Sequence, residues 1–227
     1  MLDHMPTRAP ISRRERPAKP ALSREVIVEA ALLVLERDGA EKLTIRRVAD
    51  ELDTGPASLY VYVKNVTVLH ALLIDGLLAG LDLEWDGAES WRERLHRVIE
   101  DYIALLTAHG SLARSAMFVW PDGPHYLSLI DLLLSLLRRA GLDERSAAWG
   151  IDLLLQHANI AAAEWAARAS GTGQEVDELA EALASATPGR HPTLAAFDTA
   201  VFTQGSPEER HRWALDTLLE GITHRRA

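Results

Sequence analysis

The chain has 227 residues, 48% of them apolar and none of them cysteine, so it can bury a sizeable core but forms no disulfide, thiol active site or cysteine-bound zinc site. It has no run of 18 or more apolar residues and no basic-then-apolar leader. We therefore expect neither a transmembrane helix nor a signal peptide, and a cytoplasmic location. The net charge of −9 argues against a protein that coats nucleic acid, but residues 1–65 hold 11 Lys/Arg against 10 Asp/Glu, so the acidity lies in the rest of the chain.

Residues 1–22 are a basic arm with four prolines and no helical period. One interpretation is an inert leader, because terminal segments are usually loose. The alternative is a flexible arm that adds phosphate or minor-groove contacts beside a DNA-binding domain.

A first helix is predicted over residues 24–38. Ser23 can cap it, and Gly39 stands where a helix-ending glycine belongs. Its expected apolar face consists of Val26, Ala30, Leu33, Val34 and Leu35.

The next stretch predicts a helix-turn-helix, a geometry that reads DNA. Thr44 caps a helix whose apolar stripe is Ile45, Val48, Ala49 and Leu52. Residues 53–55 form the turn, and Pro56 begins a helix that runs to Val61 or Tyr62. Leu59 faces inward, whereas the residues expected to face solvent or DNA are Arg46, Arg47, Ser58, Tyr60 and Tyr62.

A connecting helix is predicted over residues 66–81, capped by Asn65 and about 24 Å long. Further helices are expected over 91–108, 111–117, 125–140, 143–170, 176–186, 193–202 and 207–222. The helix over 143–170 is apolar nearly all round, so one side should meet the core and another a partner. The expected fold class is all-α.

The nine histidines are scattered, and no metal-binding spacing, nucleophile elbow or phosphate-binding glycine loop is present. We therefore expect no metal, no cofactor and no enzymatic activity. An apolar small-molecule pocket is favoured instead, because the aromatic residues of the C-terminal helices should converge. Its predicted residues are Tyr102, Phe118, Trp120, Tyr126, His157 and Trp165, with Asn159, Asp131 and Gln156 as further polar candidates. The alternative is that these aromatic residues only fill the core.

Residues 23–75 resemble the TetR family of bacterial transcriptional regulators. The resemblance rests on the run Glu36-Arg37-Asp38-Gly39, on residues 43–49 (LTIRRVA), on residues 59–65 (LYVYVKN) and on Leu69. The run over residues 59–65 is similar to the tetracycline-repressor branch, whereas the more usual form of the family has Phe in place of Val63. Two departures from the family are the Asp53-Thr54-Gly55 turn and Val66, where the family commonly has a phosphate-binding Lys.

The resemblance implies that Tyr60 and Tyr62 touch DNA and that Thr44 contacts a phosphate. It also implies a homodimer through the helices at 143–170 and 207–222, a near-palindromic double-stranded operator and a small-molecule effector, most simply a repressor released by its ligand. The full predicted DNA-binding set is Thr44, Arg46, Arg47, Thr54, Pro56, Ala57, Ser58, Tyr60, Tyr62 and Lys64.

The expected domains are residues 1–22, a flexible basic arm; residues 23–69, the DNA-binding domain; and residues 70–227, the ligand-binding and dimerisation domain. The alternative function is a helical small-molecule-binding or interaction protein that lacks specific DNA binding. This alternative is suggested by Val66, which stands where the family commonly has a Lys.

Overall fold

The computed structural model describes residues 21–39, 42–171 and 174–224, and every regular element within them is a helix. The all-α class is therefore confirmed, while the arm expected over residues 1–22 lies almost wholly outside the described residues. The helices are α1 (Arg24–Asp38), α2 (Ile45–Glu51), α3 (Pro56–Leu59), α4 (Val66–Leu78), α5 (Trp91–Ala108), α6 (Gly110–Ala116), α7 (Pro124–Arg139), α8 (Glu144–Ser170), α9 (Gln174–Ala184), α10 (Pro192–Ala195), the 3-10 helix η3 (Thr199–Phe202) and α11 (Pro207–His224).

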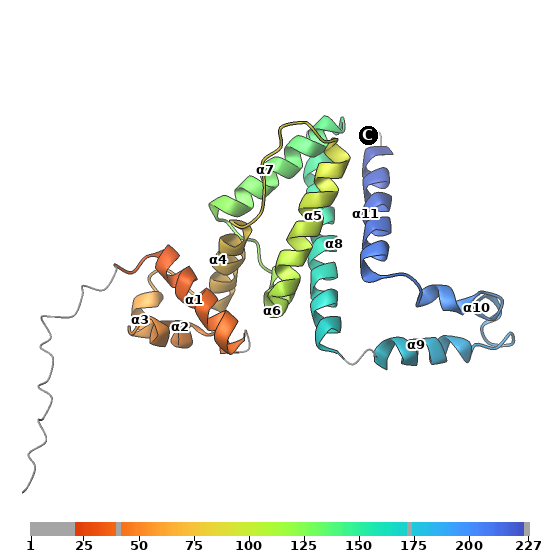
Figure 1. Ribbon diagram of the computed structural model, residues 1–227, viewed down its shortest axis with the longest axis horizontal. Coiled ribbons are helices and arrows are strands. Elements are labelled where there is room, and N and C mark those ends of the chain that lie inside the picture. Colours follow the sequence, from red (N-terminus) through yellow and green to blue (C-terminus); the bar gives the residue numbers. More distant parts are fainter. Residues whose placement is uncertain (1–20, 40–41, 172–173, 225–227) are drawn as a thin grey trace, which may run out of the picture.

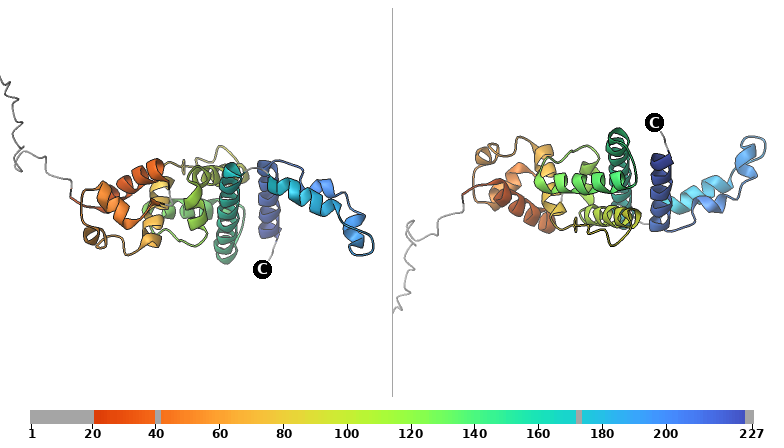
Figure 2. Two further views of the ribbon diagram at one scale, coloured as in Figure 1. Left: turned by 90° about the horizontal axis from the view of Figure 1, so that it is seen from below. Right: turned by 90° about the horizontal axis from the view of Figure 1, so that it is seen from above.

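The helices are arranged from one end of the molecule to the other in three groups (Figure 1). The short helices α1–α3 lie at one end, and α4 leads from them into a body built of α5–α8. Helix α11 runs beside α8, and α9 to η3 extend away from the body at the end opposite α1–α3 (Figure 2). The DNA-binding helices expected from the sequence are therefore joined to the body through α4.

Helix α1 begins and ends as its sequence predicts. The Ser23 hydroxyl accepts the backbone N–H of Val26, and Gly39 takes a positive φ of 77°. The buried face, however, is centred on Ile27, Ala31 and Val34, whereas Leu33, expected to be buried, is exposed. Because α1 packs against both α2 and α4, its neighbours select the face of a segment that is apolar on nearly every side.

Helix α4 ends at Leu78, three residues before the predicted end. Its N-terminus is capped as expected, since the Asn65 side chain accepts the N–H of Val68 at 2.9 Å. At its C-terminus the chain tightens into three-residue hydrogen bonds, such as Gly80 N–H to the Leu77 carbonyl at 3.0 Å, and leaves the helix at Gly80. The helix is about 20 Å long instead of 24 Å, and it contacts α1, α5, α6 and α7.

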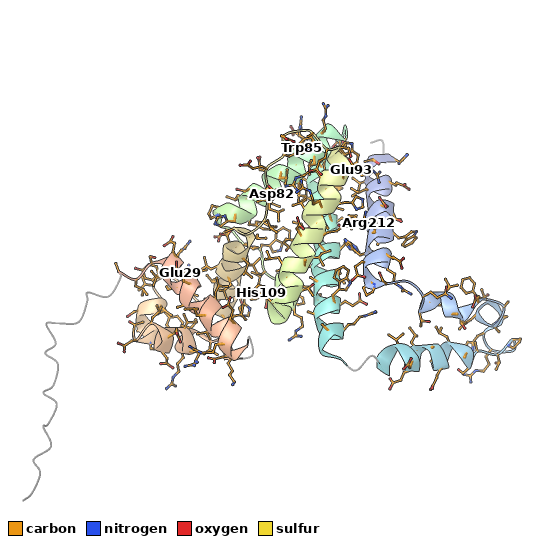
Figure 3. The ribbon with its side chains drawn as sticks, in the orientation of Figure 1. Glu29, Asp82, Trp85, Glu93, His109 and Arg212 are labelled. Atoms are coloured by element: carbon orange, nitrogen blue, oxygen red, sulfur yellow. The ribbon has the colours of Figure 1, made fainter. Side chains whose placement is uncertain are left out.

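The body is organised around α5 and α8, which pack against each other. Helix α5 starts in a complete capping box between Ser90 and Glu93. The loop before it folds back, because buried Arg94 donates to the Glu84 carbonyl at 3.1 Å and Arg97 pairs with Asp82 at 3.0 Å. Asp82, Trp85 and Glu93 lie together near the start of α5 (Figure 3).

The predicted helix over residues 193–202 is wrong, since the chain forms two single turns, α10 and η3, that bury no side chain. Asp198 explains the interruption, because its side chain accepts the N–H of Ala200 and starts a new turn. The capping box before α11 is confirmed by the paired hydrogen bonds of Ser206 and Glu209. On α11, Arg212 reaches Glu100 of α5 at 2.6 Å (Figure 3).

Candidate functional site

The helix-turn-helix forms through local interactions that the sequence specifies. The Thr44 hydroxyl accepts the N–H of Arg47 at 3.1 Å and caps α2. Asp53 adopts the left-handed region with φ 46°, which turns the chain out of α2, and Pro56 is the first residue of α3. Helix α3 is one turn long, shorter than predicted, because after Leu59 the chain tightens into a three-residue bond from the Tyr62 N–H to the Leu59 carbonyl.

The predicted DNA-binding residues fall into two groups by exposure. Those with exposed side chains are Thr44, Arg46, Ala57, Ser58, Tyr60 and Lys64, and Tyr60 is 53% exposed. Those that are half-buried are Arg47, Thr54, Pro56 and Tyr62. The expected outward projection of Tyr62 is therefore only partial, because its ring packs against the buried core that Leu59 and Val63 join.

Because Arg47 lies off the apolar stripe, it was expected to face solvent or DNA. Its side chain is instead half-buried and held by an ion pair. Its guanidinium pairs with Asp38 at the end of α1, with Nη2 and Oδ2 2.7 Å apart. Arg37 joins the same network through Glu51 at 2.7 Å. Hydrogen bonds from Arg37 and then Arg47 lower the pKa of Asp38 to about 2. Arg47 therefore ties α2 to α1, and Arg46 is the exposed cation of the pair.

A cavity of about 300 Å³ lies within the body, which reaches the lower end of the range common for small-molecule sites. Its walls come from α4, α5, the end of α6 and the segment that follows it, α7 and α8. The lining residues are Ile74, Tyr102, Ala116, Met117, Val119, Trp120, Pro121, Tyr126, Ile130, Leu134, Ala148, Ile151, Asp152, Leu155, Gln156 and Asn159. The lining is mainly apolar, with a few polar groups on α5, α7 and α8.

The polar groups of the cavity are joined by hydrogen bonds. The Tyr102 hydroxyl donates to Asn159 Oδ1 at 2.7 Å, and Asn159 Nδ2 donates to the carbonyl of Ala116 at 3.0 Å. Gln156 Nε2 donates to Asp152 Oδ2 at 2.6 Å. Burial raises the pKa of Tyr102, and burial together with the Asp152 charge raises the pKa of Tyr126. Both phenols are therefore neutral at pH 7, and Tyr102 already donates its single hydroxyl proton to Asn159.

Three of the six predicted ligand residues line the cavity, namely Tyr102, Trp120 and Tyr126. Phe118 does not, since its side chain is 80% exposed. His157 and Trp165 lie outside it against α11, where the His157 and His211 rings stack 5.0 Å apart and Trp165 meets His211 edge-on at 5.8 Å.

Of the further polar candidates, Asn159 and Gln156 line the cavity, whereas Asp131 borders a separate surface hollow beside Trp85.

The lining residues that the sequence analysis missed include Asp152, Ile130 and Leu134, and these share simple helical spacings with lining residues that it did predict. Asp152, Gln156 and Asn159 stand at i, i+4 and i+7 on α8, and Ile130 and Leu134 follow Tyr126 in steps of four on α7. These spacings can be read from the sequence. Because α8 is apolar on most sides, however, its pattern alone does not show which side faces the cavity.

Helix α4 connects the cavity to the helix-turn-helix. Its residue Ile74 lines the cavity. The next residue, Asp75, is buried and accepts the backbone N–H of Tyr126 on α7 at 2.8 Å. His70, one turn earlier, shares a hydrogen bond of 2.8 Å with Ser115 of α6. Helix α4 therefore contacts both α6 and α7 beside the cavity and continues from the helix-turn-helix.

The described residues offer neither a metal-binding cluster nor a membrane-spanning helix. No group of three or more His, Asp or Glu side chains in the described part of the chain could hold a metal ion. Among those residues, no helix is both long and apolar enough to cross a membrane.

Comparisons with known proteins agree with this geometry. Residues 85–226 match the family model for the tetracyclin repressor-like C-terminal domain. The chain is 29% identical over 222 residues to the HTH-type transcriptional repressor DrrR1 of Streptomyces coeruleorubidus, covering 92% of this chain and 80% of that protein. A crystal structure of the Streptomyces transcription regulator SCO7704 superposes with a TM-score of 0.78 at 44% identity, covering 92% and 98% of the two chains. The structure of ActR from Streptomyces coelicolor in complex with actinorhodin gives 0.79 at 30% identity, covering 89% and 97%.

Proposed function

Because the chain belongs to the TetR family of transcriptional regulators, we propose that it is a homodimeric repressor that binds a near-palindromic operator and leaves it when a small molecule fills the cavity. The observation that carries the proposal is the double role of α4. This helix begins at the helix-turn-helix and ends against the cavity, where Ile74 lines the wall.

The DNA-binding part of the proposal is supported by exposed donors that lie close together in the chain. The Tyr60 and Ser58 hydroxyls can bond phosphates or base edges, and Arg46 and Lys64 supply positive charge. Thr44 is already occupied as the cap of α2, yet a hydroxyl that accepts one N–H can still donate its proton to a phosphate.

Ligand control follows from the contacts of α4 with both α6 and α7. A ligand that fits one arrangement of the cavity better than another shifts α4 and with it the spacing of the two DNA-binding ends. The coupling is reciprocal, so operator DNA weakens the ligand by the same factor by which the ligand weakens DNA binding. ActR has been crystallised with actinorhodin and with (S)-DNPA, which supports a small-molecule effector for this chain.

Dimerisation is supported by apolar side chains that a single protomer leaves exposed on α8 and α11. Trp149 is 70% exposed, and Leu153 and Ile160 follow on the same side of α8. Trp213 on α11 is 72% exposed. Packing these two helices against a second copy would bury this surface, and two copies could place their α3 helices about 34–36 Å apart, as successive major grooves require.

The first experiment measures operator binding by fluorescence anisotropy with DNA that flanks the gene. Tyr60→Phe removes one exposed hydroxyl from each protomer and should weaken operator binding by the dimer about 30-fold, as expected for one lost hydrogen bond of roughly 1 kcal/mol in each half-site. Tyr62→Ala should weaken it further. The unfolding midpoint of Tyr60→Phe is the control and should not change. Unaltered DNA affinity in both variants would contradict the assignment.

The second experiment tests the dimer by analytical ultracentrifugation. Trp213→Glu places a charge on the proposed interface and should give monomers that no longer bind the operator. Leu127→Glu is the matched control, because Leu127 is an exposed apolar residue that belongs to neither of the two interface helices; it lies on α7, where it borders the surface hollow beside Trp85. A Trp213→Glu protein that remains dimeric would refute this interface.

One observation favours the alternative of a ligand-binding protein without specific DNA binding. Val66 is exposed at the first position of α4, where it offers no charge to a phosphate. Absence of operator binding at low salt, together with a bound small molecule, would select this alternative. In either case we infer binding without chemical conversion, and turnover of the bound compound would contradict that.

A further inference from the structure

The cavity carries a single charged wall group. Asp152 is the one Asp, Glu, Lys or Arg among the described residues that line it. Its carboxylate is held by Gln156, whose Nε2 donates at 2.6 Å, and its charge reaches the Tyr126 hydroxyl. A carboxylate accepts several hydrogen bonds, so Asp152 keeps acceptor capacity for a ligand.

The remaining walls favour a flat aromatic partner. Tyr126, which is half-buried, and Trp120, which is 70% exposed, line the same cavity as Asp152, and the other lining residues are mainly aliphatic. Aromatic faces bind both aromatic rings and cations, and the attraction to a cation grows when water is excluded.

The sign of the charge discriminates between ligand classes. Asp152 is half-buried, so a neutral ligand that covers it removes water from the carboxylate without replacing the lost hydrogen bonds, which costs free energy. An anionic ligand adds repulsion between like charges at close range. A protonated amine replaces the lost water with a charge-assisted hydrogen bond.

We propose that the effector is an aromatic molecule bearing a protonated amine, whose ammonium group binds the Asp152 carboxylate while its rings lie against Tyr126 and Trp120. This inference rests on the proposed function, since it takes the cavity as the effector site. It names the chemical class that the site selects.

The test uses three probes with one skeleton and different charges: 2-(aminomethyl)naphthalene, 2-(hydroxymethyl)naphthalene and 2-naphthoate. Isothermal titration calorimetry of the full-length protein at pH 7 should rank them amine, alcohol, carboxylate. We expect the amine to bind at least tenfold more tightly than the alcohol, a difference of about 1.4 kcal/mol.

Asp152→Asn should abolish the tenfold preference for the amine and leave the alcohol unaffected. The substitution keeps an oxygen that can accept from Gln156, and alcohol binding reports that the cavity remains folded. Asp131→Asn is the matched control, because it removes the same charge from α7 outside the cavity. It should keep the preference.

The inference is overturned if the wild type binds the alcohol as tightly as the amine, prefers the carboxylate, or binds none of the probes. It is also overturned if Asp152→Asn retains the preference. Operator binding by the ligand-free protein is measured separately. If the protein binds the amine selectively but binds no operator, the repressor function is refuted and the proposed ligand class is retained. If it binds the operator but shows no preference for the amine, the ligand class is refuted and the repressor function is retained.

Discussion

Asp75 caps α7 from a different helix, and its removal should destabilise the protein measurably. Its carboxylate is 7% exposed and accepts the N–H of Tyr126, the third residue of α7, at 2.8 Å. The residue at the cap position of α7 is Gly123, which has no side chain to accept that hydrogen bond. Asp75 of α4 therefore acts as the N-cap of α7 and places a carboxylate at the N-terminus of that helix.

The magnitude follows from the geometry. Loss of an N-cap costs about 0.5–2 kcal/mol, and loss of a hydrogen bond to a charged group costs about 1.5–3 kcal/mol; these overlap, because they describe one interaction. Asp75→Ala should therefore lower the free energy of unfolding by about 2–3 kcal/mol. In a chain of this size that corresponds to a fall in Tm of roughly 4–12 °C. Asp75→Asn keeps an acceptor oxygen and should cost about 1 kcal/mol.

Gly123 provides an independent test, because a Cβ there would lie 2.1 Å from Asp75 Oδ2. Gly123→Ala should force the carboxylate away from α7, so we expect it to cost about as much as Asp75→Ala. The double variant should be no less stable than either single variant, because the same hydrogen bond is lost only once.

The assay is urea unfolding at a fixed protomer concentration, since dimer stability depends on concentration. Additive costs in the double variant would refute the capping role of Asp75. So would an Asp75→Ala protein as stable as the wild type.

Three further predictions concern charge, pH and packing. Arg46→Ala should lower the salt slope of operator binding by about 2, one for each protomer of the dimer, whereas Arg47→Ala should leave the slope unchanged because its charge is paired within the protein. Equal slopes in anisotropy titrations would contradict this. The pKa of His211 is lowered to about 4, mainly by burial. Between about pH 6.5 and pH 4, this histidine is therefore protonated in the unfolded chain but neutral in the folded chain. Stability should therefore fall as the pH falls through that window, and His211→Gln should flatten the fall of the urea midpoint; an unchanged slope would contradict it. Gly76→Ala would place a Cβ 2.8 Å from Val28 Cγ1, so overpacking of about 1–3 kcal/mol should outweigh the helix-propensity gain of about 1 kcal/mol. Adding Val28→Ala should recover part of the loss in thermal unfolding, and no recovery would assign the loss to another cause.

The sequence determined those features that depend on neighbours along the chain. The caps at Ser23, Thr44, Asn65 and Ser90 are each confirmed by a short-range hydrogen bond. Asp53 turns the chain as its residue type allows. Such interactions span three or four residues, so they can be recognised without knowledge of the fold.

Only the tertiary structure decided which of several possible faces each helix buries and which distant groups meet. The segment over α8 is apolar on most sides, so packing against α5 and α11 turned His157 and Trp165 toward His211 and left Asp152 for the cavity. The pairing of Arg47 joins residues nine positions apart on two helices, and that of Asp75 with Tyr126 spans 51 positions. Contacts of this kind depend on how whole helices pack, and no local pattern encodes them.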